Sequence, residues 1–71
     1  MNKPIYDLQH QVQDALAELN EMRGARIDVL DNNGIVTLTG FVPTADARER
    51  AESIVRGMDG VVSVINELNV I

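Results

Sequence analysis

The chain has 71 residues, 45% of them hydrophobic, and a formal net charge of −5 from six basic and eleven acidic side chains. This length fits one domain near the lower size limit for a self-sufficient core, and the apolar share is too high for a disordered chain. The excess of acid argues against binding to nucleic acid, and the absence of cysteine excludes disulfides and thiolate chemistry.

The first predicted element is an amphipathic helix. Apolar residues recur three and four positions apart, as one stripe of a helix requires. They are Ile5, Leu8, Val12, Ala15, Leu16, Leu19 and Met22. Pro4 suits the first turn, and Gly24 suits the position just past the end, where a positive φ closes a helix. The acidic residues Asp14, Glu18 and Glu21 are expected on the outer face of this helix.

A β-hairpin is predicted next. Ile27 and Val29 alternate with polar residues, which is typical of a short strand. The Asn33-Gly34 pair tolerates the positive φ of a tight turn. A second strand is expected over Ile35–Val42, and alternation divides it into two faces. One face holds Val36, Leu38, Gly40 and Val42, and the other holds Ile35, Thr37, Thr39 and Phe41.

A second helix is expected over residues 44–58. Thr44 is a suitable N-cap, and Asp46 places a carboxylate in the first turn, where the helix dipole favours it. Arg48, Glu52 and Arg56 stand four apart and are expected on the outer face as alternating charges. The inward stripe comprises Ala47, Ala51, Ile54, Val55 and Met58.

The last strand is expected over residues 62–70, with Val64, Asn66, Leu68 and Val70 on one face. The order α-β-β-α-β predicts an α/β (α+β) fold, a two-layer sandwich in which two helices cover one face of a three-stranded mixed sheet. The strand–helix–strand connection makes the last strand parallel to the middle strand. We expect a single domain over residues 1–71.

The two strand-like segments together resemble the BON domain family, a bacterial module of osmotically inducible and secretion-associated proteins. The resemblance rests on Val36–Gly40, and on Gly60-Val61 followed by Val64 and Asn66. It implies a non-enzymatic domain that binds phospholipid or mediates attachment at membranes and assemblies. It also implies that members are often exported and carry two or more copies. The family supplies no catalytic residues.

Four residues are predicted to have structural roles: Gly34, Gly40, Gly60 and Asn66. Gly40 lies on the core face of the middle strand, where glycine lets a helix backbone pack closely against the sheet. The alternative is a ligand that passes close to the backbone. Asn66 lies on the core face of the last strand, and a buried amide must be hydrogen-bonded. We expect its partner in a nearby loop or helix-end backbone, with a polar anchor in a pocket as the alternative.

The candidate interaction residues lie on the face of the sheet that the helices leave uncovered. They are Ile35, Thr37, Thr39, Phe41 and Ile65. Uncovered apolar sheet faces tend to be interfaces. Together with Leu30, these side chains therefore predict a contact patch for a protein partner or for a second copy in a homo-oligomer.

No catalytic, cofactor-binding or metal-binding residue is predicted. His10 is the single histidine, is expected to be exposed, and has no evident second ligand. The acidic run of the first helix could gather a cation, but such a run is most often a solvated face. Three function classes stay open: protein interaction or self-association through the uncovered sheet face, phospholipid association, and a small enzyme. The third lacks any nucleophile–base set or phosphate loop.

The compartment follows from what precedes the first helix. No apolar run reaches the ~20 residues of a membrane span, and residues 1–4 do not begin a secretory signal. The chain as given is expected in the cytoplasm, and the periplasm is the alternative if it is a fragment of a longer exported protein.

Overall fold

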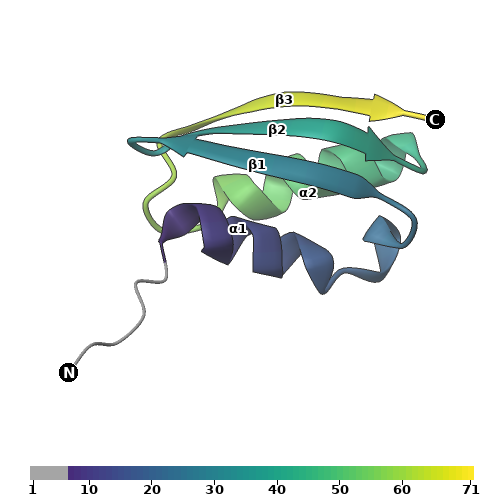
Figure 1. Cartoon of the computed structure of the whole chain (residues 1–71), viewed down its shortest axis with the longest axis horizontal. Helices are drawn as coiled ribbons and strands as arrows, with labels where there is room; N and C mark the ends of the chain where they lie inside the picture. The colour runs from purple at the N-terminus through teal and green to yellow at the C-terminus, as the bar shows by residue number, and fades with distance from the viewer. Residues whose placement is uncertain (1–6) are drawn as a thin grey trace.

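The computed structural model describes residues 7–71, which form two α-helices under one face of a three-stranded sheet (Figure 1). In chain order the elements are α1 (Leu8–Ala17), the 3-10 turn η1 (Asn20–Met22), β1 (Arg26–Asn32), β2 (Ile35–Val42), α2 (Ala45–Arg56) and β3 (Ser63–Val70). The predicted order α-β-β-α-β and the two-layer arrangement are confirmed. The predicted roles of Pro4 and Ile5 lie outside the described residues.

The sheet has the order β1-β2-β3, so the middle strand is central as expected. β1 pairs with β2 in antiparallel fashion, and β3 pairs with β2 in parallel fashion. The hairpin turns on Asn33 and Gly34, whose φ values are 53° and 91°. Positive φ at both positions suits the twist of the two flanking strands. The side chain of Asp31 holds the turn by accepting the Gly34 N–H at 2.9 Å.

The core lies between the helices and the inner face of the sheet. It is built from aliphatic and methionine side chains. The burial pattern along β2 confirms the predicted alternation of that strand. The buried residues are Val12, Leu16, Met22, Val29, Val36, Leu38, Val42, Ala47, Ala51, Val55 and Leu68. Val70, which was expected among them, is 46% exposed because it ends a strand that has no neighbour on its outer side.

The first helix is shorter than its apolar stripe predicts. α1 ends at Ala17, Glu18 is its C-cap, and Leu19 is extended with ψ 132°. Asn20 then begins the 3-10 turn, which brings Met22 into the core at 7% exposure. The stripe continues across this break because both segments face the same core, and asparagine favours turns over helix interiors.

The end of this region also differs from the prediction. Gly24 has the predicted positive φ, but it follows the 3-10 turn and does not cap the α-helix.

The second helix follows its prediction closely. Thr44 is the N-cap, and its hydroxyl accepts the N–H of Ala47 at 3.0 Å. Asp46 lies in the first turn and Arg56 in the last, which matches the helix dipole at both ends. Gly57 is the C-cap.

Candidate functional site

The face of the sheet away from the helices, called the open face below, is built from every second residue of the three strands. The pairing register arranges these residues in four rows that run across β1, β2 and β3. From the hairpin end onward, the rows are Asn32, Ile35 and Ser63; Leu30, Thr37 and Ile65; Asp28, Thr39 and Glu67; and Arg26, Phe41 and Asn69.

The structure places all five candidate interaction residues on the open face. Large apolar side chains are exposed there, with exposed fractions of 62% for Leu30, 41% for Ile35, 37% for Phe41 and 44% for Ile65. Their exposure makes them available for contact, and a role in binding stays a prediction.

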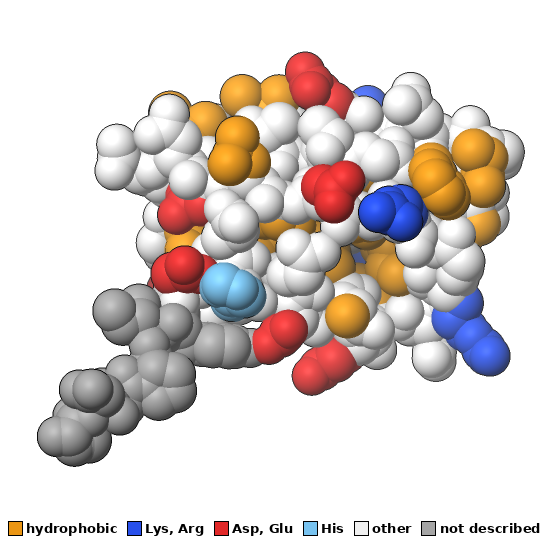
Figure 2. Space-filling view, in the orientation of Figure 1, with side chains coloured by type: hydrophobic (Ala, Val, Ile, Leu, Met, Phe, Trp, Pro, Cys, Tyr) orange, Lys and Arg blue, Asp and Glu red, His pale blue; other side chains and the backbone are white. Residues whose placement is uncertain are grey.

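The expected apolar patch is divided by charge. Leu30 and Ile65 share one row, whereas Phe41 lies two rows further along, at roughly 13 Å. The row between them holds Asp28 and Glu67 on the two outer strands. Figure 2 shows hydrophobic and acidic side chains next to one another along the upper surface, on the side of the sheet away from the helices. Sequence reasoning missed this acidic row: alternation in each outer strand assigns Asp28 and Glu67 to the open face, but their alignment in one row depends on the pairing register.

The outer edge of β1 is covered by side chains from α1. The side-chain amide of Gln13 donates to the carbonyl oxygen of Ile27 at 2.7 Å. The side-chain oxygen of Gln9 accepts the backbone N–H of Asp31 at 3.2 Å. An uncovered edge would present such backbone groups to another strand. These bonds therefore obstruct strand addition at β1.

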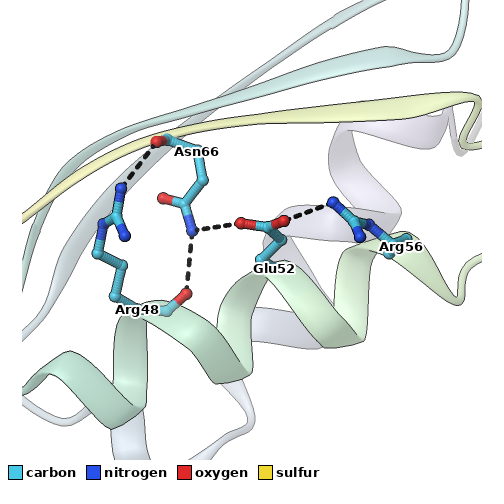
Figure 3. Close-up of polar contacts among 4 residues, drawn as sticks. All are labelled: Arg48, Glu52, Arg56 and Asn66. Atoms are coloured by element: carbon cyan, nitrogen blue, oxygen red, sulfur yellow. Dashed lines mark hydrogen bonds and ion pairs between the residues drawn. The ribbon is translucent and has the colours of Figure 1, made fainter.

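The outer edge of β3 is covered from α2 (Figure 3). The guanidinium of Arg48 donates to the carbonyl oxygens of Leu68 at 2.9 Å and Asn66 at 3.2 Å. The Asn66 amide donates to the carbonyl oxygen of Arg48 at 3.0 Å and to the carboxylate of Glu52 at 3.2 Å. Its oxygen accepts the Leu68 N–H at 3.1 Å. Glu52 also pairs with Arg56. This network fixes α2 against β3.

The network changes one prediction and explains another. Arg48 was expected on the outer face of the second helix, but it is partly buried because its guanidinium reaches the backbone of the edge strand. Only Glu52 and Arg56 form the predicted pair of alternating charges. Asn66 is only partly buried, but its amide is hydrogen-bonded as expected, and it donates to a backbone carbonyl of α2.

Position 40 requires glycine for a different reason from the one predicted. Gly40 has φ +115°, and a Cβ there would lie 2.0 Å from the carbonyl oxygen of Arg26 in β1. The expected close approach to a helix is therefore wrong, since the neighbouring strand occupies this space. At the hairpin, a Cβ on Gly34 would lie 2.7 Å from the carbonyl oxygen of Gly60.

The single histidine is exposed and belongs to a helix cap. The ring Nδ1 of His10 lies 2.7 Å from a carboxylate oxygen of Asp7, and its backbone N–H donates to the same oxygen at 3.0 Å. Both hydrogen bonds lower the pKa of Asp7, and the bond from the backbone N–H has the larger effect. Asp7 is the N-cap of α1, so this contact stabilises the start of the helix.

The predicted acidic run does not share one helix face. Because α1 ends at Ala17, Glu21 lies in η1, where its carboxylate is 3.7 Å from Arg50. Within residues 7–71, no group of three His, Asp or Glu side chains is placed to hold a metal ion.

A hollow of about 250 Å³ lies between α1, η1 and β1. It is lined by Gln13, Leu16, Ala17, Met22, Ala25 and Ile27. Small-molecule sites usually measure roughly 300–1,000 Å³. The hollow is therefore small for such a ligand.

Comparison with known proteins identifies related sequences and folds. The family model described as BON domain matches residues 7–71. The outer membrane lipoprotein DolP of Haemophilus influenzae is 33% identical over 64 residues, which cover 89% of this chain. The osmotically-inducible protein Y of Escherichia coli is 33% identical over 60 residues, or 84% of this chain. The C-terminal domain of CdsD, the structural protein of the type III secretion system of Chlamydia trachomatis, is 25% identical with a TM-score of 0.62 over 89% of this chain.

The matches cover only part of each longer protein. The chain spans 33% of the lipoprotein, 30% of the osmotically-inducible protein and 33% of the CdsD chain. None of the helices within residues 7–71 is long and apolar enough to cross a membrane.

Proposed function

Because the chain belongs to the BON domain family, we propose that it is a non-enzymatic protein-interaction module that binds through the open face. The observation that carries this proposal is the exposure of four large apolar side chains on one sheet face. Helix side chains bond to both sheet edges, so strand addition there is obstructed. The open face is therefore the favoured place for a partner.

The relatives support a role within a larger assembly. CdsD is described as a structural protein of a secretion system, and its matching part is a domain of similar fold. DolP is described as an outer membrane lipoprotein, which favours the cell envelope as the place of action. We assign the binding role to the single domain predicted over residues 1–71.

Phospholipid binding is the second candidate, and the likeness to an outer membrane lipoprotein favours it. Docking on anionic lipid requires free surface cations. Three arginines are already engaged by the β3 backbone or by carboxylates, namely Arg48, Arg50 and Arg56. Among residues 7–71 this leaves Arg23 and Arg26, on a chain of net charge −5. Charge therefore favours a protein partner.

Site-specific photo-crosslinking in the full-length protein tests the proposed function. A photoreactive residue in place of Thr37 samples the open face, and one in place of Ser53 samples exposed α2 as the matched control. We expect a discrete protein crosslink from Thr37 only, lost when Ile65→Glu is added. Crosslinks to lipid from Thr37, or equal protein crosslinks from both positions, would contradict the proposal.

A further inference from the structure

The charged row in the middle of the open face restricts what can cover that face. Asp28 and Glu67 are both exposed, and within residues 7–71 neither carboxylate has a side-chain hydrogen bond or an ion pair. Thr39 stands between them on β2, so the two residues are roughly 10 Å apart across the sheet. Apolar side chains lie on both sides of this row, with Leu30 in the adjacent row and Phe41 in the next row on the other side.

A second copy is the simplest occupant to consider. In one of the two common classes of face-to-face sheet packing, the strands of the two sheets are nearly aligned. If the two-fold axis runs along the strands, β1 of one copy covers β3 of the other and each row faces itself. Leu30 then covers Ile65, which is favourable. However, Asp28 covers Glu67 of the second copy, and this happens twice. Like charges in such positions oppose association.

The other centred arrangement has its two-fold axis across the strands. The third row then covers the second row, so Asp28 faces Leu30 and Glu67 faces Ile65. Each carboxylate would lose water without gaining a partner. Shifting the axis toward the Phe41 end leaves the apolar end of the face uncovered. Both centred, strand-aligned pairings of two identical faces therefore carry a penalty from the acidic row.

We propose, resting on the proposed function above, that the acidic row disfavours a second copy and selects a protein partner with a basic side chain between two apolar ones. A cation above Thr39 lies between both carboxylates, where it satisfies them together. Successive rows are two residues apart, roughly 6.6 Å. Alternate residues of a partner strand have the same spacing. The partner therefore presents an apolar, a basic and a second apolar side chain, in that order, along one face of a strand.

The same chain with reversed charges serves as a surrogate partner. In Asp28→Lys/Glu67→Lys, the pairing with the axis along the strands places lysines over the carboxylates of the unmodified chain. Leu30 still covers Ile65, and Phe41 covers Phe41. Sedimentation velocity of each chain alone and of their equimolar mixture measures association.

The expected result is that each chain alone is a monomer and the mixture forms a heterodimer. We expect roughly a hundredfold or more between the heterodimer and either self-association constant. A neutral variant, Asp28→Asn/Glu67→Gln, should associate with itself more strongly than the unmodified chain. The control Glu49→Lys/Asp59→Lys makes the same change of net charge at exposed residues outside the open face, and should not pair with the unmodified chain.

Three results would overturn the inference. The first is a wild-type dimer that Phe41→Glu dissociates, which would leave the proposed function of the open face intact. The second is a mixture that stays monomeric although circular dichroism shows both chains folded. The third is that the control Glu49→Lys/Asp59→Lys associates equally strongly with the unmodified chain, which would show that net charge alone explains the effect. Absence of any discrete protein crosslink from Thr37 in the full-length protein without Ile65→Glu would instead contradict the proposed function itself.

Discussion

The close approach at Gly40 gives a quantitative test of the sheet geometry. A side chain there meets two obstacles: φ is +115°, and a Cβ would lie 2.0 Å from the carbonyl oxygen of Arg26. The backbone conformation costs about 1–3 kcal/mol, and displacing β1 adds about 1–3 kcal/mol. We therefore expect Gly40→Ala to lower the free energy of unfolding by about 2–6 kcal/mol. A domain of 71 residues has about 4–11 kcal/mol in total.

Urea denaturation followed by circular dichroism measures this loss, provided that the slope of the transition is unchanged. Gly57→Ala is the matched control, because Gly57 has φ −85° and a Cβ there would be 3.7 Å from its nearest neighbours. We expect that control to stay within about 1 kcal/mol of wild type. Equal midpoints for Gly40→Ala and wild type would refute the reasoning.

Four further predictions concern the core, the α2–β3 network, the helix cap and lipid. Leu38→Ala should lower the free energy of unfolding by about 2–5 kcal/mol, and Leu30→Ala at a 62% exposed site by less than about 0.5 kcal/mol; equal losses in urea titrations would contradict the strand register. Asn66→Ala should cost about 1–3 kcal/mol because it removes three part-buried hydrogen bonds, whereas Asn69→Ala on the open face should leave the urea midpoint nearly unchanged. Because hydrogen bonds at the N-cap lower the pKa of Asp7 from 3.8, its stabilisation is present above that pH and is lost as the pH falls through the folded pKa. Asp7→Ser should therefore flatten the fall of the urea midpoint in that acid range, and an unchanged pH profile would argue against this cause. In sedimentation with phosphatidylglycerol vesicles at physiological salt, the chain should stay in the supernatant; salt-sensitive sedimentation would instead support lipid binding.

Local sequence patterns predict most of this fold. Alternation in β2 assigns Val36 and Leu38 to the core and Phe41 to the open face, because side chains of a strand point to opposite faces. Thr44 marks the start of α2 because its hydroxyl can satisfy a free N–H of the first turn. These features depend on neighbouring residues alone, so a sequence is sufficient to reveal them.

Features that depend on pairing between distant segments were not predictable in the same way. Arg48 has the spacing of a solvent-exposed helix residue, but the edge of β3 lies within reach of its long side chain. The division of the open face by Asp28 and Glu67 depends on the register of three strands, which periodicity in any single strand does not specify.

The helix break at Leu19 was hidden because the apolar spacing continues through it into Met22.

The course of the chain through the domain bears on how several copies would bind. α1 begins beside the start of β3, since a Cβ on Gly60 would lie 3.6 Å from the Leu8 side chain. β3 then runs roughly 26 Å to the opposite end (Figure 1). Copies joined in series would therefore follow one another lengthwise, each with its own open face and with edges that do not merge into one sheet. A short flexible linker gives the second binding event an effective concentration of about millimolar. Even a weak affinity at a single face would then produce strong avidity, with the linker span deciding which partner spacing is bound.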